Sequence, residues 1–265
     1  MPELPDLAVF KQYFDATALH QEVEEVTVRD TIVLEALSRR RLSAALNGNS
    51  FESTRRHGKY LFTHIDDHWL AWHFGMTGHL KYFKDEADEP DYVQLLISFT
   101  NGYHLAYVMP RKLGQIELID SVDDFLAAHK LGPDVLQDGF DLAAFKQAVS
   151  GHRSMVKSTL MNQEIMAGIG NVYSDEILFQ AGIHPRTKID ALAEATLDRL
   201  FQTMRRVLQT AIDDYRADPE QFPDTWLTPH RRAGEQCPTG KGQLKRIKVS
   251  GRSAYFCPAC QKESN

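Results

Sequence analysis

The sequence predicts an α+β fold, with a β-sandwich first, helices second and a small β-hairpin module at the end. Short alternating strands separated by turn residues follow one another as far as about residue 120, a pattern that is typical of a sandwich or barrel. Beyond that point the apolar residues repeat with the period of amphipathic helices. The three cysteines all lie at position 237 or later and mark the terminal module.

The first half begins with a predicted helix over residues 6–19, with Asp6 as its N-cap. Predicted strands follow at residues 23–28, 60–65, 69–74, 93–99, 103–108 and 115–119. Asn101-Gly102, between two of these strands, is a strong hairpin signal because such turns need positive φ. We therefore expect an N-terminal β-sandwich domain over residues 1–125.

The second half is predicted to be helical. Short helices are expected at residues 122–129, 142–149, 154–163 and 174–181, and Leu192 to Ile212 mark one long amphipathic helix. Phe222-Pro223-Asp224 ends this part. The pattern predicts a helical domain over residues 126–225 and a hairpin module over residues 226–265.

Composition restricts the class of protein. Hydrophobic residues make up 43% of the 265 residues, which is ordinary for a globular core. Since no apolar run approaches a membrane span and the start lacks a signal peptide, we expect a cytoplasmic protein that does not contact membranes. The net charge of −6 argues against nonspecific wrapping of nucleic acid. Residues 230–252, however, are basic, with Glu235 as the single acid.

The first five residues, Met1-Pro2-Glu3-Leu4-Pro5, allow two interpretations. One is an ordinary chain end that caps a helix or strand. The other starts from removal of Met1, which the small side chain of Pro2 favours. The exposed secondary amine would titrate at about pH 8, so a useful fraction is uncharged at neutral pH. It could then attack a sugar C1′ and form an iminium ion, as a lysine amine does when it forms a Schiff base. Glu3 would stand beside it as a proton shuttle.

Two glycine-containing turns in the first half are candidate sites. Lys59, at the start of a strand, is either a surface lysine or an amine that binds a phosphate. Met76 lies in Gly75-Met76-Thr77-Gly78, where it is either a core residue or an apolar wedge between bases.

A third turn, Gly168-Ile169-Gly170, precedes a helix. It is either a plain corner or an anion site built from backbone N–H groups.

The cysteines outline an incomplete zinc site. Cys257-Pro258-Ala259-Cys260 is half of a zinc knuckle, and Cys237 lies upstream. The place of a fourth cysteine is taken by Gly240, and His230 could supply the fourth ligand by reaching across, although its spacing is unusual. The alternatives are therefore a zinc site with one ligand missing and a hairpin without metal.

In their order and spacing these stretches resemble the formamidopyrimidine-DNA glycosylase and endonuclease VIII family of bifunctional DNA glycosylases and AP lyases. The resemblance covers nearly the whole chain. It rests on Pro2-Glu3-Leu4-Pro5, Gly58-Lys59-Tyr60-Leu61, His73-Phe74-Gly75-Met76-Thr77-Gly78, Leu131-Gly132-Pro133, Gly168-Ile169-Gly170-Asn171-Val172-Tyr173, Ala181-Gly182-Ile183-His184-Pro185 and Gly251-Arg252-Ser253-Ala254-Tyr255-Phe256-Cys257-Pro258-Ala259-Cys260-Gln261. It implies a β-sandwich, a helix–two-turns–helix domain and a zinc-finger-like hairpin.

The resemblance implies roles for four catalytic residues. Pro2 would be the Schiff-base nucleophile that removes an oxidised base, and Glu3 would protonate the sugar ring oxygen. Lys59 would contact a phosphate and act in β-elimination. Arg252, at the tip of the hairpin, would bind a phosphate and favour δ-elimination.

The resemblance also implies DNA contacts. Met76 would fill the gap left by the flipped nucleotide, and Arg111 would face the orphaned base. Leu113 stands where the formamidopyrimidine branch tends to have a wedge phenylalanine. Asn171 would hold the phosphate beside the lesion, and Arg153 falls at a further basic phosphate contact. We therefore expect damaged DNA as the partner of a monomer.

Departures from the family pattern define the open questions. Gly240 places zinc binding by Cys237, Cys257 and Cys260 in doubt. Residues 218–236 leave little room for the loop that covers 8-oxoguanine in the family, so a preference for other lesions is predicted. The rival function is a non-catalytic protein that binds damaged or abasic DNA. A metal-dependent nuclease has little support, because no acidic cluster has metal-ligand spacing.

Overall fold

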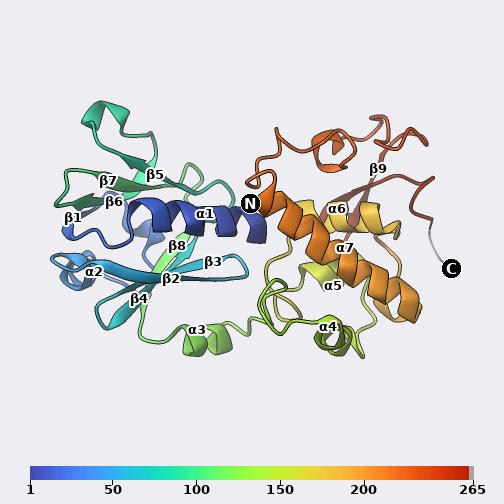
Figure 1. Cartoon of the computed structure of the whole chain (residues 1–265), viewed down its shortest axis with the longest axis horizontal. Coiled ribbons are helices and arrows are strands. Elements are labelled where there is room, and N and C mark those ends of the chain that lie inside the picture. Colours follow the sequence, from blue (N-terminus) through green and yellow to red (C-terminus); the bar gives the residue numbers. More distant parts are fainter. Residues whose placement is uncertain (263–265) are drawn as a thin grey trace. The chain divides into compact units, whose positions relative to one another are not determined.

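The computed structural model describes residues 1–262 and divides into two compact units (Figure 1). The first unit is Met1–His129, and the second begins at Lys130. Strands dominate the first unit, while helices and a C-terminal hairpin make up the second. The α+β fold predicted from the sequence is confirmed. A separate hairpin module from residue 226 stays a prediction.

Two four-stranded antiparallel sheets form the first unit. One sheet has the order β1-β6-β7-β5, with β1 at Val23–Val28, β6 at Val93–Phe99, β7 at His104–Val108 and β5 at His79–Phe83. The other has the order β2-β3-β4-β8, with β2 at Phe51–His57, β3 at Tyr60–Ile65, β4 at His68–His73 and β8 at Gln115–Ile119. Helices α1 (Leu4–Thr17), α2 (Arg39–Leu46) and α3 (Val122–Ala128) complete the unit, with short 3-10 turns η1 (Thr31–Val33) and η2 (Glu86–Asp88).

Helix α1 begins before the predicted position. Glu3 is its N-cap, and Asp6, predicted to be the cap, is instead the third helical residue of a capping box. The Glu3 N–H donates to Asp6 Oδ2 at 2.8 Å. Pro5 is compatible with this start, because N–H groups in the first turn of a helix have no carbonyl partner within the helix and the N–H that proline lacks is not needed there. The prediction of Asp6 as the N-cap is therefore wrong.

Two strands and one α-helix of the first unit were not predicted, and their sequences explain why. Strand β2 is Phe-Glu-Ser-Thr-Arg-Arg-His, with only its two end residues buried, so it lacks regular alternation. Helix α2 opens with three arginines after the N-cap Ser38. Strand β5 is only five residues long.

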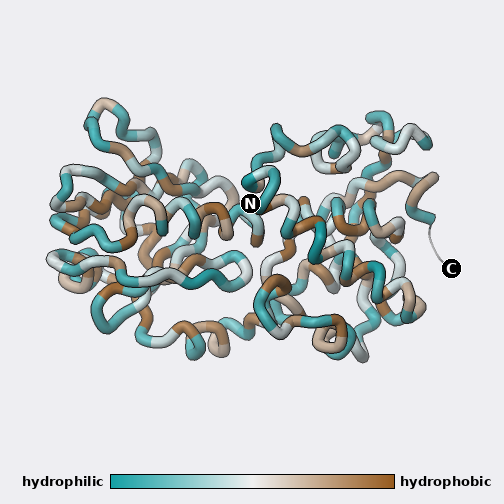
Figure 2. Tube along the Cα trace, in the orientation of Figure 1, coloured by the Kyte–Doolittle hydropathy of each residue, from teal (hydrophilic) through white to brown (hydrophobic). Residues whose placement is uncertain are grey.

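The second unit contains helices α4 (Leu142–Val149), α5 (Val156–Met161), α6 (Asn171–Ala181) and α7 (Glu194–Asp213). It also contains 3-10 turns η3 (Ile189–Ala191) and η4 (Thr228–His230) and the hairpin of β9 (Lys245–Val249) and β10 (Arg252–Phe256). Along α7, apolar and polar stretches alternate (Figure 2), and residues such as Leu200, Met204 and Leu208 are buried. Within residues 1–262, no helix has the length and apolar character needed to cross a membrane.

Candidate functional site

The predicted nucleophile and its acid lie at the start of α1. Pro2 is partly exposed, and Glu3, which directly follows it, is 2% exposed. Burial raises the pKa of the neighbouring Asp6 carboxyl to about 6, and the Glu3 carboxylate adds to this effect. A chain end with two carboxyl groups, one of which titrates near neutral pH, is suited to moving protons to and from an amine.

Packing fixes the direction of α1. Phe14, which is fully buried, meets Phe51 of β2 edge-on with ring centroids 5.0 Å apart. Phe10 lies 4.7 Å from the ring of Phe74, just past the end of β4. The helix is thus held against the sheet that contains β2, β3 and β4, and its N-terminus is positioned by this core.

Lys59 occupies a two-residue loop between β2 and β3. Gly58 precedes it with φ +55°, the conformation that the first central residue of a type II′ turn adopts and that glycine allows. Lys59 is only 8% exposed. Burial, and then the Lys59 charge, lower the pKa of His73 to about 4, so the imidazole is neutral at pH 7.

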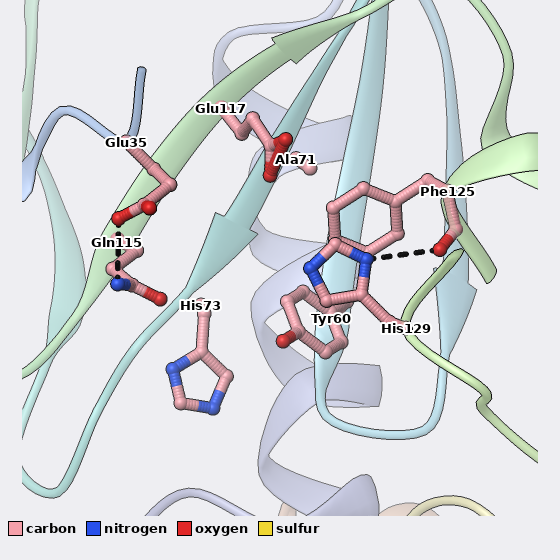
Figure 3. A pocket seen from close by; sticks show the side chains of 8 residues that line it. All are labelled: Glu35, Tyr60, Ala71, His73, Gln115, Glu117, Phe125 and His129. Carbon is pink, nitrogen blue, oxygen red and sulfur yellow. Dashed lines mark hydrogen bonds between the residues drawn. The ribbon is translucent and has the colours of Figure 1, made fainter. Parts of the chain in front are cut away.

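His73 belongs to a small pocket that sequence reasoning missed. The pocket has a volume of about 100 Å³ and is lined by Glu35, Tyr60, Ala71, His73, Gln115, Glu117, Phe125 and His129. Figure 3 shows the rings of Tyr60, Phe125 and His129 on one side and the pair Glu35–Gln115 on the other. The Tyr107 hydroxyl donates to the His73 carbonyl at 2.7 Å and holds this residue in place. The register that pairs Tyr60 with His73 would have revealed this neighbourhood.

Substitution of Lys59 by methionine is expected to raise the pKa of His73. Methionine keeps much of the side-chain volume and removes the positive charge that opposes protonation of the imidazole. The pKa should stay below about 6.5, since burial, the larger cause, persists. Titration of the His73 ring by NMR measures the shift, and Lys81→Met on β5 is the control. An unchanged pKa would contradict the assigned influence of Lys59.

The three residues expected in the DNA stack lie on two adjacent loops. Met76 and Leu113 are 41% and 51% exposed, and Arg111 is also exposed. The loops touch at Gly75, where an added Cβ would come within 2.5 Å of the Leu113 carbonyl carbon. Gly75 also has φ +56°. The interpretation of Met76 as a core residue is therefore wrong, and the loops that carry Met76 and Leu113 are in contact at Gly75.

In the second unit, Asn171 is the first residue of α6. The glycine loop before it is organised by Gln163, whose side chain accepts from the Gly168 N–H at 3.0 Å and donates to the Ile169 carbonyl at 2.8 Å. Within residues 1–262, Asn171 Oδ1 is a buried oxygen that makes no hydrogen bond. Because buried polar atoms in proteins are nearly always paired, this oxygen, which can only accept a hydrogen bond, is suited to a donor group.

Arg252 begins β10 directly after the hairpin turn. Ser250 and Gly251 form this two-residue turn with φ +46° and +79°, both positive as a type I′ turn requires. The Ser250 and Ser158 hydroxyls are 2.7 Å apart, which ties the turn to α5. Arg153 is exposed on the loop that precedes α5.

The three cysteines form one group. The sulfur atoms of Cys237, Cys257 and Cys260 all lie within 4.8 Å of one another, so together they could hold a metal ion. His230 is not part of this group, because its ring nitrogens lie 3.1 Å from Glu235 Oε1 and 3.0 Å from the Asp224 carbonyl oxygen. Gly240 is exposed and provides no side-chain ligand.

Both units match known domains. Residues 1–116 match the formamidopyrimidine-DNA glycosylase N-terminal domain, and residues 131–218 match the formamidopyrimidine-DNA glycosylase H2TH domain. The class of protein that these domains define is a DNA glycosylase of DNA repair.

Whole-chain comparisons agree. A formamidopyrimidine-DNA glycosylase of Geobacter metallireducens is 34% identical over 270 residues, which cover 98% of this chain and 100% of that protein. One of Desulfitobacterium hafniense is 29% identical over 273 residues, with the same coverage of both chains. A solved complex between the Lactococcus lactis Fpg and an abasic site containing DNA has a TM-score of 0.88 at 27% identity and covers 98% of this chain and 100% of that one. The chain therefore belongs to the formamidopyrimidine-DNA glycosylase family.

Proposed function

We propose that this protein removes oxidised bases from DNA and then cuts the strand at the abasic site through an N-terminal proline Schiff base. The observation that carries the proposal is the start of α1, where Pro2 directly precedes the buried N-cap Glu3. Removal of Met1 would make Pro2 the terminal amine. A secondary amine beside carboxyl groups has the chemistry that an imine-forming nucleophile needs.

The steps follow from these groups. The Pro2 nitrogen attacks C1′, the glycosidic bond breaks and the base leaves with a proton. Glu3 protonates the ring oxygen, so that the sugar opens to an iminium ion. Loss of a C2′ proton to a base, which Lys59 would assist, then breaks the C3′–O bond and releases the phosphate with the bonding electrons. Loss of a C4′ proton breaks the C5′–O bond in the same way, with Arg252 holding the phosphate.

Damaged DNA is the proposed partner of this protein, which would act as a monomer. Solved relatives from Lactococcus lactis are complexes with DNA that contains an abasic site or Fapy-dG. Asn171, the first residue of α6, and the exposed Arg153 and Arg252 fit phosphate contacts, because helix N-termini and guanidinium groups supply hydrogen-bond donors. The exposed loops of Met76, Arg111 and Leu113 fit insertion into the base stack.

Borohydride trapping tests the reaction class. Reduction converts the iminium ion into a stable protein–DNA adduct, so DNA with an abasic site should be trapped by the wild type and not by Pro2→Gly. Both proteins should bind the DNA equally well. Binding without an adduct by wild type that has lost Met1 would favour the rival function, a damage-recognition protein. Release of 8-oxoguanine compared with oxidised pyrimidines would then measure the lesion preference.

We further propose that the three-cysteine group binds zinc with one protein ligand missing. Cys237 Sγ and Cys260 Sγ lie 3.7 Å apart. In a tetrahedral zinc site with zinc–sulfur bonds of about 2.3 Å, two sulfur ligands are separated by roughly 3.8 Å, which is close to this distance. The hydroxyl of Thr239 lies 3.2 and 3.1 Å from these two sulfur atoms. Bound zinc would fasten residues 237–240 to the strand end at Cys257.

Gly240→Cys is expected to increase the affinity for zinc by at least about tenfold. Removal of a residue that only hydrogen-bonds to a metal ligand already lowers metal affinity by about this factor, so a direct ligand should contribute at least as much. A Cβ at Gly240 meets no atom within 4 Å, although its φ of +72° adds strain. Gly240→Ser is the matched control, with the same strain and no thiol. Titration with Co²⁺, followed by visible absorption, measures the affinity. Equal affinities in wild type and Gly240→Cys would contradict a missing fourth ligand.

A further inference from the structure

A buried network of charges in the second unit has no part in the reaction described above. Its centre is Asp175 of α6, which is 1% exposed. Asp175 Oδ1 accepts from the Lys157 Nζ of α5 at 2.6 Å, and both side chains are fully buried. A buried charge persists only with partners of this kind, because removal from water is so unfavourable.

The other carboxylate oxygen of Asp175 holds the C-terminal segment. Arg231 Nη2 donates to Asp175 Oδ2 at 2.8 Å, and the backbone N–H of Tyr255 in β10 donates to the same oxygen at 3.2 Å. The Arg231 guanidinium also lies 5.1 Å from the centre of the Tyr255 ring. One carboxylate thus connects α5, α6, the segment after η4 and the hairpin.

The same two cations reach Asn171. Lys157 Nζ and Arg231 Nη2 each donate to the Asn171 carbonyl oxygen at 3.2 Å. Two positive charges against the one negative charge of Asp175 leave a net charge of +1 beneath the first turn of α6. This charge adds to the partial positive charge of the helix N-terminus, and both favour a phosphate beside Asn171.

We propose that Asp175 is a positioning residue that joins Asn171 to the hairpin of Arg252, so that the two phosphate contacts act as one rigid group. This inference rests on the proposed function, in which both residues hold phosphates. Gln261 supports the other end of the hairpin segment, since its side chain accepts from the Cys257 N–H and donates to the Ile183 carbonyl, both at 2.9 Å. It does not touch Asn171. The Ser158–Ser250 contact also ties the hairpin turn to α5, whereas Asp175 binds the hairpin backbone and both cations that hold the Asn171 carbonyl.

Arg231→Gln tests the link with the buried Lys157–Asp175 pair left intact. The expected result is a lower ratio of δ- to β-elimination products, by at least about threefold, because the hairpin of Arg252 loses the Arg231 contacts to Asp175 and to the Tyr255 ring. Trapping through Pro2 should be unchanged. Asp175→Asn should shift the ratio in the same direction where that variant folds. Arg206→Gln, which removes an exposed charge on α7 that donates to Gln180, is the matched control and should retain the wild-type ratio.

A double-mutant cycle measures the coupling energy between Asn171 and Arg252 in DNA binding. General destabilisation of the protein would not change this coupling energy. Asn171→Ala and Arg252→Ala should be coupled in binding to abasic-site DNA in the wild-type background and additive, within about twofold, in the Arg231→Gln background. A wild-type product ratio together with unchanged coupling in Arg231→Gln would overturn the inference. Absence of any trapped adduct from the wild type would instead overturn the proposed function, so the two failures are distinguishable.

Discussion

Glu3→Gln should slow release of the damaged base by about 100-fold or more, the range expected for loss of a general acid or base. Glutamine has nearly the same shape as glutamate, and its amide oxygen can still accept the hydrogen bond of the α1 capping box. It cannot supply a proton to the sugar ring oxygen. The folded protein and its affinity for DNA should therefore be retained while the chemical step is lost.

Single-turnover excision from an oxidised-base duplex measures this effect. Glu24→Gln, the same chemical change at an exposed position of β1, is the control and should react at the wild-type rate. On DNA that already contains an abasic site, Glu3→Gln should still give some borohydride adduct, because the nucleophile remains. A rate within about twofold of the wild-type rate would remove Glu3 from the mechanism.

Trp72→Ala should lower the free energy of unfolding by about 3–5 kcal/mol, the usual effect of truncating a large buried aromatic residue. Trp72 of β4 is fully buried, and its ring meets Tyr107 edge-on at 5.6 Å. Its Nε1–H donates to Thr63 Oγ1 at 3.0 Å. Truncation would leave a cavity and an unpaired buried hydroxyl beside the sheet on which α1 packs.

Urea denaturation followed by circular dichroism measures the loss. Trp72→Phe is the matched variant, since it keeps an aromatic ring and removes the N–H, and it should lose less stability than the alanine variant. A loss below about 1 kcal/mol for Trp72→Ala would mean that the surrounding core closes over the cavity.

Local sequence patterns predicted the parts of the fold that depend on near neighbours. Strands β1, β3, β6 and β8 lie at the predicted residues, because alternation of apolar side chains over a few positions determines which face is buried. The glycine turn Gly75-Met76-Thr77-Gly78 was also predicted from its residue types, and the exposure of Met76 agrees with the predicted apolar wedge, whose role stays a prediction. Strand β2 was missed because only its two end residues are buried, and Phe51 packs on Phe14 of α1, which lies much earlier in the chain.

Asp175 and Glu176 illustrate what sequence patterns do not contain. Two consecutive acids in an apolar helix are a visible signal, but their partners are far along the chain. Asp175 binds Lys157 and Arg231, while Glu176 accepts from the backbone N–H groups of Leu227 and Thr228 at 3.2 and 2.7 Å. Burial raises the pKa of the Glu176 carboxyl, an effect that depends on the surrounding structure.

By itself, therefore, the sequence determined the α+β fold class, the majority of the strands and helices, the Pro2-Glu3 terminus as a candidate nucleophile and acid, and the three cysteines as candidate metal ligands. Each of these depends on residue type and short spacing. Only the tertiary structure decided that Lys59 acts on His73, that Gly75 brings the Met76 and Leu113 loops together and that Asp175 connects Asn171 to the hairpin. Such contacts join residues far apart in the chain, and the electrostatic effect of each charge depends on its distance from the others and on its burial.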